Sequence, residues 1–152
     1  MQTVEIAEIL TDVKTRLTAY GITLKDTDDV LLKYSGQMVR ETITNNCNQP
    51  EIPAGLRCIA ADMIIGDFLQ TLKVFAPDRL ESFDLGEVVK QIQTGDTNTV
   101  FAVGEGSSTD EQRLDAVVNW MLNHGKGQFA KYRRVCWWGK RCRKPIQRLG
   151  RP

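Results

Sequence analysis

The chain has 152 residues, of which 41% are hydrophobic and 26% are charged. This size and composition predict one soluble globular domain with its own core. No apolar run approaches the ~18 residues that a membrane span requires, and the N-terminal stretch MQTVEIAEIL is acidic and amphipathic, unlike a signal peptide. We therefore expect no membrane partner, and a protein that is made in the cytosol or built into a particle assembled there.

The formal net charge of +1 conceals an uneven distribution. Residues 116–152 contain ten Lys or Arg residues and no Asp or Glu, whereas residues 1–115 contain the other ten basic residues and all nineteen acidic ones. Such asymmetry is typical of an acidic folded body joined to a basic interaction segment.

The first part of the chain predicts two amphipathic helices. Over residues 3–20, apolar side chains recur at three- and four-residue steps, Thr3 is suited to cap the start, and Gly21 is suited to close the end. A second helix is expected to begin near Thr27 and to break at the run NNCNQPEIP. The apolar residues that it carries are Val30, Leu31, Tyr34, Met38 and Ile43.

The segment after Pro53, AGLRCIAADMIIGDFLQTLKVF, is apolar on nearly all sides. A helix without a wide polar face is surrounded by other elements or by another subunit, so this segment predicts the central helix. Its small residues Ala60, Ala61 and Gly66 would allow close neighbours.

The run TGDT, which contains Gly95 and Asp96, predicts the turn of a β-hairpin near residues 88–103. Ser108 and Glu111 then have the spacing of a capping box, which starts a helix that ends near His124. The expected fold is mainly α: a small bundle of four to five helices with one β-hairpin and an extended basic C-terminal tail. We expect a helical domain over residues 1–128 and a tail over residues 129–152.

No catalytic constellation is visible. His124 lies at a predicted helix end without a nucleophile motif, and Asp62 and Asp67 are expected to accept hydrogen bonds or to pair with a basic residue. The cysteine spacings do not match those of zinc sites, so reduced thiols are expected at Cys47, Cys58, Cys136 and Cys142. We therefore expect no enzymatic activity, no cofactor and no metal.

The strongest local signal is the C-terminal segment, in which basic residues are interspersed with aromatic ones. Its residues are Tyr132, Arg133, Arg134, Trp137, Trp138, Lys140, Arg141, Arg143, Lys144, Arg148 and Arg151. This pattern suits docking in an acidic protein groove, with the tryptophans as anchors. It also suits nucleic acid, through phosphate contacts and base stacking. A merely solvated end normally lacks paired tryptophans.

The chain has three predicted helices, with CIAADMIIGDFLQ in the third, followed by VKQIQTGDTNTVF and by a capped helix that runs into FAKYRRVCW. The order of these predicted elements resembles that of the head-tail connector (adaptor) proteins of tailed bacteriophages. The resemblance covers roughly residues 3–138 and rests on this order, on the Gly95-Asp96 turn and on the stretch Tyr132-Arg133-Arg134. Residues 139–152 extend past the matching part and are more basic than the family pattern.

The resemblance implies a helical protein, neither an enzyme nor a cofactor binder, that forms a ring, commonly of twelve subunits, in the neck of the virion. The ring would be assembled in the host cytoplasm beneath the portal protein of the filled head. Its C-terminal segment would dock on the portal, its lower face would meet the stopper or tail, and genomic double-stranded DNA would pass through its channel. The alternative hypothesis is a small nucleic-acid-binding protein that uses the basic tail.

Overall fold

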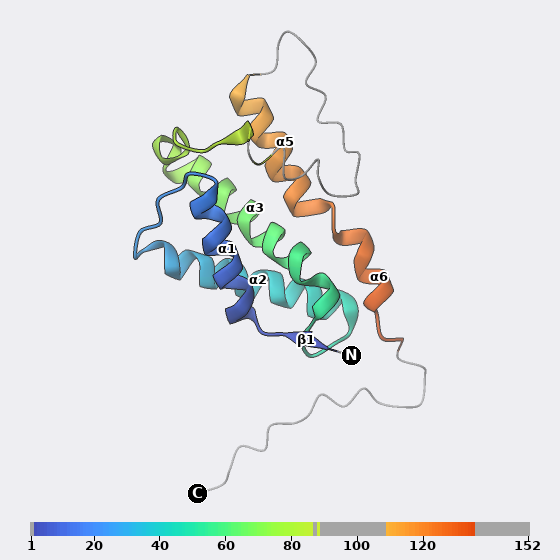
Figure 1. The fold of residues 1–152 in the computed structure, drawn as a ribbon. Helices are drawn as coiled ribbons and strands as arrows, with labels where there is room; N and C mark the ends of the chain where they lie inside the picture. Colours follow the sequence, from blue (N-terminus) through green and yellow to red (C-terminus); the bar gives the residue numbers. More distant parts are fainter. Residues whose placement is uncertain (1, 87, 89–108, 136–152) are drawn as a thin grey trace, which may run out of the picture.

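The computed structural model describes residues 2–86, 88 and 109–135. Over these residues the chain forms a helical bundle in which α1 (Ile6–Ala19), α2 (Asp28–Cys47) and α5 (Asp110–Asn123) pack around α3 (Arg57–Phe75) (Figure 1). The predicted mainly α fold is confirmed. None of the described helices is both long enough and apolar enough to cross a membrane.

Helix α1 begins at Ile6, so the predicted cap at Thr3 is wrong. Thr3 instead belongs to a short strand, because pairing with a distant segment takes residues that the local pattern assigned to the helix. The end of α1 is as predicted. Gly21 has a φ of 85°, and the amide of Ile22 donates to the carbonyl of Leu17 at 3.1 Å, which is the arrangement that a glycine after a helix allows.

Strands β1 (Thr3–Val4) and β2 (Ile52–Pro53) form a two-stranded antiparallel sheet, which is not the predicted hairpin. That hairpin lies outside the described residues except for Val88. Val88 is helical rather than extended, since its amide donates to the carbonyl of Asp84 at 3.3 Å. The side chain of Val88 is fully buried in this helical turn, so its apolar character does not require a strand.

Helix α2 begins after Thr27 and ends before Asn48, whose φ is 51°, and both ends match the prediction. Of the apolar residues predicted along it, only Ile43 is buried; Val30, Leu31, Tyr34 and Met38 are exposed. The cause is Gly36, where an added Cβ would lie 3.3 Å from side-chain atoms of α1. Because α1 approaches α2 at this glycine, the opposite face of α2 is left in solvent. The buried face instead carries Leu32, Ser35, Gly36, Val39, Ile43 and Cys47.

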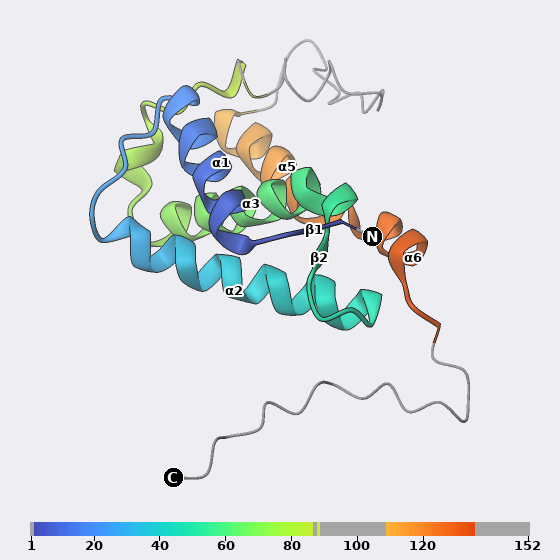
Figure 2. The same cartoon turned by 60° about the horizontal axis from the view of Figure 1, so that its bottom comes forward.

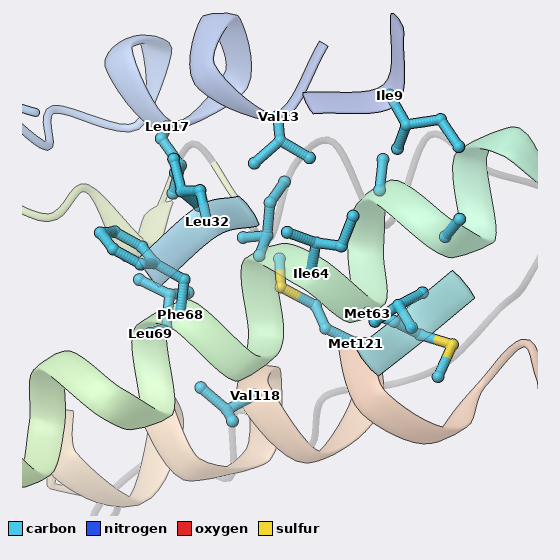
Figure 3. Packing of buried hydrophobic residues seen from close by; sticks show 14 of the residues in the cluster. Ile9, Val13, Leu17, Leu32, Met63, Ile64, Phe68, Leu69, Val118 and Met121 are labelled. Carbon is cyan, nitrogen blue, oxygen red and sulfur yellow. The ribbon is translucent and has the colours of Figure 1, made fainter. Parts of the chain in front are cut away.

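Helix α3 is the central helix, as predicted, and follows one turn of 3-10 helix, η1 (Ala54–Leu56). Figure 3 shows Val13 and Leu17 of α1 directed toward α3, with Val118 of α5 on its other side. Gly66 permits this proximity, because an added Cβ there would lie 3.1 Å from Met121 of α5. The buried residues of α3 are Ala60, Ala61, Asp62, Met63, Ile64, Ile65, Gly66, Phe68, Leu69 and Leu72.

Helix α5 begins with a capping box one residue later than predicted. The hydroxyl of Thr109 accepts from the amide of Gln112 at 3.4 Å, and the amide of Thr109 donates to the Gln112 side chain at 3.2 Å. Of the predicted pair, Ser108 lies outside the described residues, and the residue that completes the box is Gln112 rather than Glu111. The run SSTDEQ contains both spacings, so the sequence alone does not distinguish between the two pairs.

The predicted boundary at residue 128 does not separate the body from the tail. After η3 (Lys126–Gln128), helix α6 (Phe129–Tyr132) packs against α2, and Phe129 is buried. The folded body therefore includes α6 and the residues after it that bond to α2.

Candidate functional site

The predicted docking segment is described at its beginning, where Tyr132, Arg133 and Arg134 lie. The hairpin-turn residues Gly95 and Asp96 lie outside the described residues. So do the other predicted docking residues, namely Trp137, Trp138, Lys140, Arg141, Arg143, Lys144, Arg148 and Arg151. The candidate site is therefore the place where the helical body meets the basic C-terminal residues.

The main chain of Arg134 is held by the C-terminal end of α2. Figure 2 shows α6 next to this end of α2. The last carbonyls of a helix lack partners within it. The amide of Arg134 donates to one of them, the carbonyl of Cys47, at 2.8 Å. Asn48, in its left-handed conformation, places Nδ2 3.3 Å from the carbonyl of Arg134. Hydrogen bonds on both sides therefore fix this residue beside α2.

Tyr132 is fixed in two ways. The side-chain amide of Gln49 donates to its carbonyl at 2.5 Å. Its ring lies over Gly55, where an added Cβ would be 2.6 Å from the ring carbon Cζ. No side chain larger than hydrogen fits at Gly55 while the tyrosine keeps this position.

Arg133 adds a third attachment, because its Nε donates to the carbonyl of Asn46 at 2.9 Å. We name these contacts of residues 132–134 the clamp; its partner residues are Asn46, Cys47, Asn48, Gln49 and Gly55. Arg133 and Arg134 remain exposed, so their positive charges are accessible to a partner. The partner residues were missed from the sequence, where NNCNQP indicated only a helix break. Its four amide side chains were the available signal.

Cys47 is a structural thiol. Its Sγ lies 3.7 Å from the carbonyl of Phe129, and burial raises the pKa of the thiol despite the nearby charge of Arg133. Cys47 and Cys58 are both free, as predicted, while Cys136 and Cys142 lie outside the described residues. Over the described ranges, no group of three or more His, Cys, Asp or Glu side chains could hold a metal.

A buried carboxylate links three helices at the centre of the bundle. Asp62 of α3 lies 2.6 Å from Nη1 of Arg16 on α1, and 3.3 Å from Nε2 of His124 at the end of α5. Arg16 also donates to the hydroxyl of Tyr20 at 2.9 Å. Asp67 accepts a hydrogen bond from Ser35, so both carboxylates have the pairing roles expected from the sequence.

The ring of His124 is placed to carry a charge. Its Nδ1 lies 3.0 Å from the carbonyl of Trp120, and the two rings stack with centroids 3.8 Å apart. Burial lowers the pKa of His124, but the hydrogen bonds to Asp62 and to the Trp120 carbonyl outweigh burial and raise the pKa overall. Asp62 binds Arg16 and His124 at once, so the arrangement suits a structural tie between α1, α3 and α5.

These contacts define two features that bear on function: a charged network that joins α1, α3 and α5, and a clamp that fixes the start of the basic segment. Comparisons of the chain with protein-family models, with curated proteins and with solved structures gave no match.

Proposed function

We propose that this protein is a structural, ring-forming head-tail connector in the neck of a tailed-phage virion. In this proposal the basic C-terminal segment docks on the portal protein, and the opposite side of the ring meets the stopper or tail. DNA passes through the ring without being processed.

The observation that carries the proposal is the clamp. An interaction segment attached by a free linker would search a large volume, and ordering it would cost conformational entropy. Here the hydrogen bonds to Arg134 hold the start of the segment against α2. Each copy in a ring would therefore offer its basic segment from an equivalent place, which favours multivalent attachment to one symmetric partner.

Exposed apolar side chains support contacts between subunits. Val74 and Phe75, at the end of α3, are both exposed. Apolar side chains that gather at the surface of a small domain commonly mark contact sites. A head-to-tail contact that covered them would give a ring if its rotation closes.

The test combines assembly with attachment. The full chain and a variant that lacks residues 136–152 are mixed with the portal protein of the same phage, and native mass spectrometry and negative-stain images record the assemblies. The full chain should form rings on the portal, and the truncated chain should stay folded without attaching. The proposal is refuted if the full chain neither attaches to the portal protein nor forms a ring.

The alternative, nucleic-acid binding, is favoured by one observation: the side chains of Arg133 and Arg134 are exposed at the start of the basic segment. The two functions differ in which side chains matter. Portal docking should be weakened most by Trp137→Ala with Trp138→Ala, since buried aromatic anchors commonly contribute about 2 kcal/mol or more.

Binding of duplex DNA should instead fall with rising salt, and the triple variant Arg141→Ala, Arg143→Ala and Lys144→Ala should weaken it most. Both variant sets are measured against portal protein and against duplex DNA at two salt concentrations. Salt-sensitive DNA binding that the triple variant loses and the tryptophan pair keeps, without any portal binding, would establish the alternative.

A further inference from the structure

Helix α2 has an apolar face that no described residue covers. Val30, Leu31, Tyr34 and Met38 are 70%, 39%, 67% and 50% exposed. Val30, Tyr34 and Met38 follow one another at four-residue steps, so they share one face of the helix. We name these four residues the α2 stripe. Apolar side chains that gather in this way on one helix usually mark an interaction site.

The clamp places the C-terminal residues next to the same helix. Arg134 is bonded to Cys47 and Asn48 at the end of α2, and Val135 follows it with an exposed side chain. The seventeen residues after Val135 therefore start beside the helix that carries the uncovered stripe.

The distances along the chain fit a contact between the two. Met38 precedes Cys47, whose carbonyl accepts from the amide of Arg134, by nine residues, which is about 13.5 Å along the helix axis. Trp138 follows Arg134 by four residues, and an extended chain of that length spans about 13 Å. The two tryptophans can therefore reach the stripe within their own subunit.

The chemistry of the two surfaces also matches. Indole rings pack favourably on the thioether of a methionine and on another aromatic ring, and the stripe offers Met38 and Tyr34. Glu41 is exposed between Met38 and the clamp, so the path of the basic segment along α2 passes an acidic side chain. Arg40 lies one turn after Gly36, on the side of α2 that faces α1, and so away from the stripe.

We propose that, before any partner binds, Trp137 and Trp138 pack on the α2 stripe of their own subunit. This contact covers the apolar face and holds back the docking segment until a partner with higher affinity displaces it. The inference deepens the proposed function and rests on it for its purpose, but its test uses this protein alone.

The test observes the ε-methyl group of Met38 by carbon–proton correlation NMR on the full chain. An indole ring that packs over this methyl shifts its proton resonance upfield. The double variant Trp137→Ala and Trp138→Ala should move the Met38 resonance downfield and leave Met63 and Met121, which are buried in the core, where they were. Met38→Leu assigns the resonance, and Phe75→Ala, which removes an exposed aromatic ring outside α2, should not move it.

Two outcomes would overturn the inference. One is a Met38 resonance that is the same with and without the two tryptophans, which would show that they do not contact the stripe. The other is an upfield shift that disappears on tenfold dilution, which would show that a second copy of the chain supplies the rings. Either outcome leaves portal attachment to be decided by its own assay, so the two proposals fail separately.

Discussion

Asp62→Asn tests whether the buried charged network stabilises the bundle. The substitution keeps the shape of the side chain but removes the negative charge that faces Arg16 at 2.6 Å and His124 at 3.3 Å. The Asp62 side chain is only 11% exposed. Removing one partner of a buried ion pair costs about 3–5 kcal/mol. Arg16 is partly exposed and keeps the hydroxyl of Tyr20, so we expect a loss of about 2–3 kcal/mol.

Asp115→Asn is the matched control. It makes the same chemical change in a carboxylate that also links α5 to α3, through Lys73 at 2.5 Å, but its side chain is 58% exposed. Exposed ion pairs contribute about 0.2–1 kcal/mol, so the control should cost at most that much. Urea titrations followed by far-ultraviolet circular dichroism give the free energy of unfolding for each variant. If Asp62→Asn lowers the free energy of unfolding by no more than Asp115→Asn does, the buried charged network does not stabilise the bundle.

The same titrations test the charge of His124. Its pKa is raised in the folded protein above the ordinary value of 6.5. Its contribution to stability should therefore be fully present below pH 6.5 and be lost as pH rises through the folded pKa. Over about pH 5.5 to 8.5, this loss should be present in the wild type and absent from His124→Gln. If the free energy of unfolding changes with pH in the same way in both proteins, the charged form of His124 does not stabilise the fold.

Three further substitutions test the fold and the clamp. Gly55→Val should displace the Tyr132 ring and destabilise the protein by about 1–3 kcal/mol. It should also increase hydrogen exchange at the amides of the clamp, and unchanged exchange there would show that Tyr132 does not hold the clamp in place. Gly21→Ala places a Cβ against the carbonyl of Ser82 at a φ of 85°, so it should cost about 1–3 kcal/mol in the same urea assay. Met63→Asp buries an unpaired charge in the central helix and should abolish soluble expression, and a soluble, fully helical variant would argue against that burial.

Local patterns in the sequence predicted those features of the fold that depend on neighbouring residues. The ends of α2 at Thr27 and Asn48, and the glycine that closes α1, follow from preferences that act within one turn of helix. The central position of α3 could be predicted because its sequence has no polar face to turn toward solvent.

Features that depend on residues far apart in the chain could not be predicted in this way. Helix α2 has apolar residues on more than one side, and the approach of α1 at Gly36 decides that Leu32 and Val39 face the core while Tyr34 and Met38 face solvent. Thr3 likewise pairs with Pro53, which no local cap preference anticipates.

For the candidate site, the sequence by itself identified Tyr132, Arg133 and Arg134 as the beginning of a basic, aromatic segment, because charge and residue type are properties of the chain. Only the tertiary structure showed that the end of α2 fixes this beginning, and that Asp62 meets Arg16 and His124. Those contacts join residues more than forty positions apart, as in the pairs Arg16–Asp62 and Asn48–Arg134, which are separated by 46 and 86 positions. Sequence periodicity reports only which side of its own helix a residue occupies, so the partners across the bundle are decided by how the helices pack.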